Sequence, residues 1–257
     1  MPKKEILKMG TFKDRVVLIE SVGDEIGYAI AAMMASKGAK LVVLDINGKN
    51  TSDMVSRLKE IGVEVHGITA DSADCAGAKD AITSVMEKYG RIDILVNNSD
   101  LIVKNEIVNT KAQNWYNGSK ANIDPAYFMC REVIPVMRKQ GYGRIINIGS
   151  VEYLGLPNTS LYSAAKSSMF GFTRSLALET AKDNITVNWV VKGTIQSSDM
   201  SEEQVEKLAA KIPVKRLGTP DDVAGAVSFF AADTSKFITG QTFFVCGGKS
   251  LSFSMSI

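Results

Sequence analysis

The fold is decided by residues 15–45, which read RVVLIESVGDEIGYAIAAMMASKGAKLVVLD. Two apolar, β-branched runs at 15–19 and 40–45 enclose a glycine-containing turn and a stretch of helical periodicity. A strand, a helix and a second strand in this order are typical of the βαβ unit of a parallel sheet. Gly38 follows the last apolar-periodic residue, where a left-handed helix cap favours glycine. This stretch therefore predicts an α/β protein.

The same alternation continues along the rest of the chain. Further strands are predicted at 63–69, 92–97, 144–148, 186–191 and 242–245. These runs are apolar without strict alternation, as expected for strands covered by helices on both faces of a sheet. No internal repeat, low-complexity tract or Pro/Gly/Ser-rich linker divides the chain, so we expect one domain over residues 1–257.

Composition excludes several classes of function. The 30 basic and 28 acidic side chains leave almost no net charge, which disfavours a nucleic-acid partner. The apolar runs are far shorter than the roughly 20 residues that span a bilayer, and no signal peptide follows the N-terminal lysines. Cys75, Cys130, Cys246 and His66 are scattered, so neither a metal site nor a disulfide framework is expected. We expect a soluble, cytoplasmic protein that has no membrane partner.

The most informative chemical motif lies in residues 145–166, IINIGSVEYLGLPNTSLYSAAK. Ser150 is followed twelve residues later by Tyr162 and four residues after that by Lys166. Tyr162 and Lys166 face the same way on a predicted helix. A nearby ammonium lowers the pKa of a tyrosine, ordinarily near 10, toward the range useful for proton transfer to a carbonyl oxygen. Taken alone, the pair could equally be an ordinary amphipathic pair of a helix.

Several segments in order make the chain resemble the short-chain dehydrogenase/reductase superfamily over essentially its full length. They are the VVLI strand with the glycines after it, LVVLD, RIDILVNNSD, Asn122, RIINIGS, YSAAK, NITVNWVVKG and FITGQTFFVCGG. The resemblance implies a doubly wound, Rossmann-like parallel sheet of seven strands in the order 3-2-1-4-5-6-7, with helices on both faces.

The resemblance also implies a catalytic tetrad. Tyr162 would be the general acid-base, and Lys166 would tune it and hold the nicotinamide ribose. Ser150 would donate a hydrogen bond to the substrate oxygen, and Asn122 would position a water of the proton relay. Lys166 also distinguishes the chain from the similar halohydrin dehalogenases, which carry arginine there and bind no nucleotide. A nicotinamide cofactor is therefore expected.

The predicted cofactor loop departs from the family pattern Thr-Gly-x-x-x-Gly-x-Gly. Residues 20–27 read ESVGDEIG, so Gly27 keeps its register, Gly23 is extra, and Ser21 and Glu25 replace glycines. Acidic residues at a helix start complement the helix dipole. A carboxylate about 5 Å from a phosphate nevertheless costs about 3 kcal/mol at an effective dielectric near 20. Unless these carboxylates turn outward, weak cofactor binding is expected.

Asp45, at the end of the second strand, matches the acidic residue that accepts hydrogen bonds from the adenosine ribose. It would repel a 2′-phosphate, so NAD is favoured over NADP. Asp71 matches the family position that reaches the adenine, and Asn97 matches the first residue of an Asn-Asn pair. The full set of implied cofactor contacts is Ser21, Gly23, Ile26, Gly27, Asp45, Asp71, Asn97, Tyr162, Lys166, Gly193 and Ile195.

Two further departures place charges near the expected cleft. The family's Asn-Asn-Ala-Gly ends here in Ser99-Asp100, and its Pro-Gly after the sixth strand becomes Lys192-Gly193. We expect Lys192 to pair with Asp24 or Glu25 across the empty cleft as a weak, salt-sensitive latch. Residues 194–213 are expected to form a short polar substrate lid, with a turn or two of helix around 201–208.

Two hypotheses of function follow. The first is an oxidoreductase that transfers hydride between NAD and a ketone or secondary alcohol, with the overall motif pattern nearest to the family's 3-oxoacyl-thioester reductases. The alternative is a cofactor-impaired Rossmann scaffold that acts as a binding or regulatory protein. The resemblance further implies a homotetramer, with subunit contacts through helices around 114–137 and 163–182.

Overall fold

The computed structural model describes residues 12–253, in which seven parallel strands form one sheet in the order β3-β2-β1-β4-β5-β6-β7. The predicted fold class and strand order are confirmed. The strands are β1 Val16–Glu20, β2 Lys40–Asp45, β3 Val65–Thr69, β4 Ile94–Asn97, β5 Gly143–Ser150, β6 Ile185–Lys192 and β7 Thr242–Val245.

The ends of some strands differ from the predicted ranges. The strand predicted from residue 63 begins two residues later, because the Val63 amide donates to the Leu58 carbonyl at the end of a helix. The strand predicted from residue 92 also begins later, because the Ile92 amide donates to the Gln140 side chain. The Val63 and Ile92 amides are hydrogen bonded outside the sheet. A prediction from apolar residues alone therefore starts these two strands too early.

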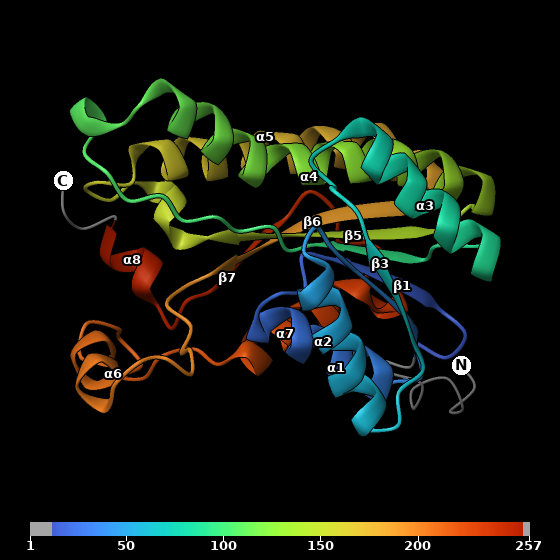
Figure 1. Cartoon of the computed structure of the whole chain (residues 1–257), viewed down its shortest axis with the longest axis horizontal. Coiled ribbons are helices and arrows are strands. Elements are labelled where there is room, and N and C mark those ends of the chain that lie inside the picture. Colours follow the sequence, from blue (N-terminus) through green and yellow to red (C-terminus); the bar gives the residue numbers. More distant parts are fainter. Residues whose placement is uncertain (1–11, 254–257) are drawn as a thin grey trace.

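Helices cover both faces of the sheet (Figure 1). One face carries α1 Glu25–Ser36, α2 Gly48–Glu60 and α7 Pro220–Ala231. The other carries α3 Cys75–Tyr89, α4 Ala112–Gln140 and α5 Ser160–Thr180. The shorter α6 Glu202–Ala209 and α8 Lys249–Phe253 lie beyond the carboxyl ends of β6 and β7, at the left of Figure 1. Within residues 12–253, no helix is both long enough and apolar enough to cross a membrane.

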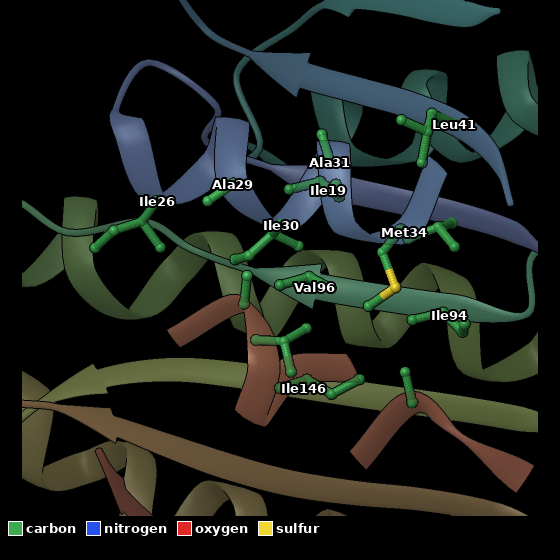
Figure 2. Packing of buried hydrophobic residues seen from close by; sticks show 14 of the residues in the cluster. Ile19, Ile26, Ala29, Ile30, Ala31, Met34, Leu41, Ile94, Val96 and Ile146 are labelled. Atoms are coloured by element: carbon green, nitrogen blue, oxygen red, sulfur yellow. The ribbon is translucent and has the colours of Figure 1, made fainter. Parts of the chain in front are cut away.

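The sheet lies between two apolar layers, which explains why its strands are apolar without alternation. Successive side chains of a strand point to opposite faces. In β1, Ile19 joins the layer under α1, where Ile30 and Met34 pack on it, and Leu18 joins the layer under α3 and α4. Figure 2 shows the first of these layers, with Ile146 of β5 reaching it from the far side of β4. Each buried side chain of this size contributes about 1.5–3 kcal/mol to stability.

The carboxyl ends of the central strands bring four polar residues to one edge. Glu20 at the end of β1 pairs in register with Asn97 of β4. Ser150 at the end of β5 pairs in register with Lys192 of β6. In doubly wound sheets, ligands bind outside this edge, where the strand order reverses. The sheet therefore places these four residues where a binding site is expected.

Candidate active site

Tyr162 and Lys166 lie on the face of α5 that covers the sheet edge, and both side chains are buried. The Lys166 ammonium nitrogen is 5.8 Å from the centre of the Tyr162 ring. It donates a hydrogen bond of 2.6 Å to the Ser99 carbonyl. The predicted pair is therefore present at the carboxyl edge, and the turn after β4 supplies its neighbours.

Asp100, in the turn after β4, joins the tyrosine to two lysines. The Tyr162 hydroxyl donates to Asp100 Oδ1 at 2.6 Å, and Lys166 Nζ lies 3.3 Å from the same oxygen. Lys192 Nζ lies 2.8 Å from the other oxygen, Oδ2. One carboxylate thus has a phenol and two ammonium groups around it, and its side chain is only 12% exposed.

The charges in this cluster set the protonation of its members. Burial and the Asp100 carboxylate both raise the pKa of Tyr162 above its ordinary value. Burial would also raise the pKa of Asp100, but Lys166 and Lys192 outweigh it and hold that pKa well below its usual range. The expected lowering of the Tyr162 pKa by Lys166 is therefore wrong, because the Asp100 carboxylate contacts the hydroxyl directly. In the free protein, Tyr162 is a phenol and Asp100 is a carboxylate.

Ser150 has an acidic partner that the sequence did not reveal. Its hydroxyl donates to the carboxylate of Glu152. Lys249 Nζ lies 3.6 Å from Glu152 and donates to the Thr194 hydroxyl at 2.9 Å. The Ser150 hydroxyl also opposes the rise in the pKa of Tyr162. The position of Glu152, two residues after Ser150, was the only available signal, whereas Lys249 is brought in from the far end of the chain.

Asn122 lies on α4, and its side chain is fully occupied by backbone. It accepts from the Leu101 amide at 3.0 Å and donates to the Leu101 carbonyl at 2.8 Å and the Gly118 carbonyl at 2.9 Å. These bonds fix the segment that follows Asp100. The structure thus brings all four predicted tetrad residues to one region. Asn122 reaches it through its hydrogen bonds to the Leu101 backbone.

Glu20 holds the other side of the same turn. Its buried carboxylate accepts from the Asn98 amide at 3.2 Å, the Ser99 amide at 3.1 Å and the Ser99 hydroxyl. It also accepts from the Ser72 hydroxyl at 2.8 Å. Burial raises the pKa of Glu20, and the serine hydroxyls oppose this shift. The sequence marked Glu20 only as an extra acid beside the cofactor loop, because its partners come from distant turns.

The cofactor loop keeps a glycine-like backbone at Ser21, one of the two positions where a family glycine is replaced. Ser21 has a left-handed backbone with φ of 60°, a conformation that favours glycine. Its amide donates to the Leu44 carbonyl at 2.8 Å. At Gly27, an added Cβ would lie 2.9 Å from the Cα of Val22. Gly27 therefore allows the first turn of α1 to pack against the loop.

The two acids of this loop point to different partners. Asp24 caps α1 by accepting from the Gly27 amide at 2.7 Å. Glu25 forms an ion pair with Arg57 of α2 at 2.9 Å, so its carboxylate is neutralised from outside the loop. The predicted latch is wrong, because the ion-pair partner of Lys192 is Asp100 and not Asp24 or Glu25. In the turn after β4, Asp100 presents its carboxylate directly to the lysine.

A cleft of about 390 Å³ runs along the carboxyl edge from Asp71 to Asp100. Asp45 lines it and accepts from the Val22 amide at 3.1 Å and the Asn50 amide group at 3.1 Å. Asp71 lies across the cleft and is 3.8 Å from Lys120. Among the described residues that line the cleft, Lys120 is the only cation. The end of the cleft that bears the Asp45 and Asp71 carboxylates is suited to hydroxyl and amino donors such as those of an adenosine.

Besides Gly23, Gly27, Tyr162 and Lys166, four more residues implied as cofactor contacts do not line this cleft. Asn97 points into the sheet and donates to Asn147 at 2.8 Å, and Ile26 is buried in the core under α1. The Gly193 amide donates to β7, and Ile195 forms an isolated bridge with a later loop. Any role of these four in cofactor binding would be through the shape of the backbone. Within residues 12–253, no three His, Cys, Asp or Glu side chains gather to hold a metal.

A family model described as enoyl-(acyl carrier protein) reductase matches residues 22–250. The chain belongs to the short-chain dehydrogenase/reductase family. Members of this family are oxidoreductases that use nicotinamide cofactors, so the chain is assigned to that class of enzyme. Membership favours the oxidoreductase hypothesis over the non-catalytic scaffold.

Relatives within the short-chain dehydrogenase/reductase family match nearly the whole chain. A (2S)-[(R)-hydroxy(phenyl)methyl]succinyl-CoA dehydrogenase subunit, BbsC of Thauera aromatica, is 42% identical over 243 residues, covering 95% of this chain and 97% of that protein. The 3-oxoacyl-[acyl-carrier-protein] reductase FabG of Escherichia coli is 33% identical, covering 92% and 98%. A solved structure from Burkholderia xenovorans, assigned to the same family, superposes with a TM-score of 0.88 at 30% identity, covering 94% and 98%.

Proposed function

We propose that the protein transfers hydride between NAD and a ketone or secondary alcohol, with 3-oxoacyl thioesters as the substrate class. The observation that carries this proposal is that Tyr162 and Lys166 both contact Asp100, which lines one end of the cleft, with Ser150 at the carboxyl end of β5. The names of BbsC and FabG describe a CoA thioester and a carrier-protein thioester, which supports this substrate class.

Three of the four tetrad side chains have a defined task in this proposal. Tyr162 gives its proton to the carbonyl oxygen in reduction and removes the hydroxyl proton in oxidation, a contribution of about 10²–10⁴ in rate. Ser150 donates a hydrogen bond to the same oxygen. Lys166 holds the cofactor ribose and stabilises the phenolate that forms. When bound, the nicotinamide supplies or accepts the hydride.

The preference for NAD rests on the charge of the cleft. A 2′-phosphate bound beside Asp45 would lie near a carboxylate, with Asp71 across the cleft. Lys120, the one lining cation among the described residues, is already close to Asp71. Charge repulsion at Asp45 therefore favours the cofactor without the phosphate.

We further propose one domain with residues 194–213 as a substrate lid, a cytoplasmic location and a homotetramer. The capping box at Ser201 starts the short α6 inside the lid segment. Exposed apolar side chains on α4 and α5 support self-association through those helices. They are Trp115, Tyr116, Tyr127, Phe170 and Leu178. Burial of such side chains between subunits is typical of stable assemblies.

Fluorescence titration with NADH and NADPH tests the cofactor assignment, and a panel of 3-oxoacyl thioesters, cyclic ketones and secondary alcohols tests the substrate class. We expect saturable NADH binding and turnover of at least one thioester. NADH binding without turnover of any of these compounds would contradict the substrate class. No binding of either nucleotide would instead support the non-catalytic scaffold.

A further inference from the structure

Asp100 has a position that the proposed function does not require. A carboxylate can only accept hydrogen bonds, so the Tyr162 hydroxyl must donate its proton toward Asp100 Oδ1 across 2.6 Å. The second oxygen is held by Lys192 at 2.8 Å, which fixes the rotation of the carboxylate. The geometry therefore keeps one defined oxygen against the catalytic hydroxyl.

The backbone around Asp100 is held on both sides. Glu20 accepts from the amides of Asn98 and Ser99, which precede Asp100. Asn122 bonds to both the amide and the carbonyl of Leu101, which follows it. Because the buried side chains of Glu20 and Asn122 bind the backbone on both sides, the carboxylate is presented to Tyr162 by a fixed turn and not by a free loop.

We propose that Asp100 is a positioning residue that holds the Tyr162 hydroxyl in its protonated form, so that the resting site carries the proton that a carbonyl oxygen takes. This inference rests on the proposed function for the role of Tyr162. In reduction, the carbonyl carbon would receive hydride from the reduced nicotinamide, and the carbonyl π electrons would move to oxygen. That oxygen takes the Tyr162 proton, which leaves its hydrogen bond to Asp100. The phenolate that remains regains a proton from solvent.

Alcohol oxidation needs the opposite starting state. There Tyr162 must begin as a phenolate, which a carboxylate in contact with its oxygen disfavours. Burial and Asp100 raise the pKa of Tyr162, and the Ser150 hydroxyl opposes them. As a result, little phenolate is present at neutral pH, and oxidation needs a higher pH than it would without Asp100.

Other charged groups also face this hydroxyl from the surrounding elements. The nearest charged groups are Asp100 from the turn after β4, Lys166 from α5, Lys192 from β6 and Glu152 from the segment after β5. Lys249 of α8 partly neutralises Glu152, Asp24 faces Lys192, and Glu20 faces Lys166. Asp100 is the carboxylate that contacts the hydroxyl itself, which makes it the residue to change.

The test is a spectrophotometric titration of tyrosine ionisation, which needs neither cofactor nor substrate. The Tyr162 signal is obtained by subtracting the titration of a Tyr162→Phe variant made in the same background. Asp100→Asn keeps the size of the side chain and removes its charge. We expect it to lower the pKa of Tyr162 by about one to three units. Glu152→Gln, the matched removal of a charge farther from the hydroxyl, should lower it less.

Lys192→Met provides a change of opposite sign. It removes a positive charge from the same cluster, so Tyr162 should stay protonated at least as far into the alkaline range as in the wild type. A general loosening of the site would instead lower the pKa of Tyr162 in both Asp100→Asn and Lys192→Met. That result, or an unchanged Tyr162 titration in Asp100→Asn, would overturn the proposal. Asp100→Gly serves as a second charge-removing variant should Asp100→Asn fail to fold.

Steady-state kinetics supply a second readout. We expect the alkaline rise of alcohol oxidation to move to lower pH in Asp100→Asn by the same one to three units, with a much smaller change in ketone reduction. If no substrate is turned over, the proposed function fails while the tyrosine titration still decides the role of Asp100. If turnover is present but the Tyr162 titration does not move, only the role of Asp100 fails.

Discussion

Arg57 of α2 forms a bidentate ion pair with Glu25 of the cofactor loop, and its two terminal nitrogens donate to the two carboxylate oxygens at 3.2 and 2.9 Å. The same guanidinium carbon lies 3.8 Å from the centre of the Tyr28 ring. The pair draws one loop carboxylate toward a neighbouring helix and neutralises it. The repulsion that a phosphate would meet at this loop is therefore smaller than the sequence suggests.

Removing the arginine should expose that repulsion. In Arg57→Ala, Glu25 loses its partner, and we expect NADH to bind more weakly, by no more than about fivefold because an exposed pair contributes at most about 1 kcal/mol. Calorimetric titration measures the change. The Arg57→Ala/Glu25→Gln double variant should recover wild-type affinity, and a failure to recover would show that Arg57 acts by another route.

Ser21 carries a backbone conformation that costs a non-glycine residue about 1 kcal/mol. Ser21→Gly relieves this cost, although glycine also gains freedom in the unfolded chain. We expect a small rise in Tm, measured by thermal denaturation, and NADH binding at least as tight as in the wild type. A drop in both quantities would mean that the serine hydroxyl has a role of its own.

The tetrad predicts large kinetic effects. Tyr162→Phe removes one hydroxyl and no apolar surface, so the fold should persist while kcat falls by about 10²–10⁴. Lys166→Ala should lose both rate and NADH affinity, because one ammonium is proposed to serve proton transfer and ribose binding together. Turnover numbers and fluorescence titrations check both variants, with circular dichroism as the control for folding. A Phe variant that reduces its ketone at the wild-type rate would remove Tyr162 from the mechanism.

Asp45 is predicted to cause a preference for NADH over NADPH. Asp45→Ser removes the charge, and Asp45→Arg reverses it, so the ratio of kcat/KM for the two cofactors should narrow in the first and invert in the second. Both variants also lose the bonds to Val22 and Asn50, so a lower Tm should accompany the change. Equal kcat/KM values for the two cofactors in the wild type would contradict this prediction at the outset.

Glu20 predicts a dependence of stability on pH. Burial raises its folded-state pKa above the usual value of 4.5. Its contribution is therefore fully present below the unfolded pKa and is lost as pH rises through the folded pKa, at up to 1.4 kcal/mol per pH unit. Chemical denaturation at pH values from below the unfolded pKa to above the folded pKa should show a falling free energy of unfolding in the wild type. Glu20→Gln should not show this fall. Parallel stability curves for the two proteins would assign the pH dependence to other groups.

The fold was predictable from sequence because it depends on local patterns. Apolar runs separated by helical periodicity and closed by glycines predicted the strands, and the family resemblance implied their order. Strand ends were misplaced where side chains such as Gln140 bind the backbone. The approach of Ser150 to Tyr162 and Lys166 was predictable because they lie on consecutive elements, whereas their tetrad roles were implied by the family resemblance and stay predictions. The contacts of Glu152 and Lys249, and the binding of the turn after β4 by Glu20, were not predictable from the sequence. They depend on where segments distant in the sequence meet.

Hydrogen bonds from Glu20 and Asn122 fix the backbone of residues 98–101 on both sides of Asp100, which affects how substitutions can change this site. Glu20 and Asn122 grip the peptide groups that flank position 100 and leave the side chain at that position outside their hydrogen bonds. An exchange at position 100 can therefore alter the charge beside the catalytic hydroxyl while the surrounding backbone keeps its path. With the role proposed for Asp100, the pH range in which alcohol oxidation proceeds is adjustable by one side chain, independently of the other residues that line the cleft.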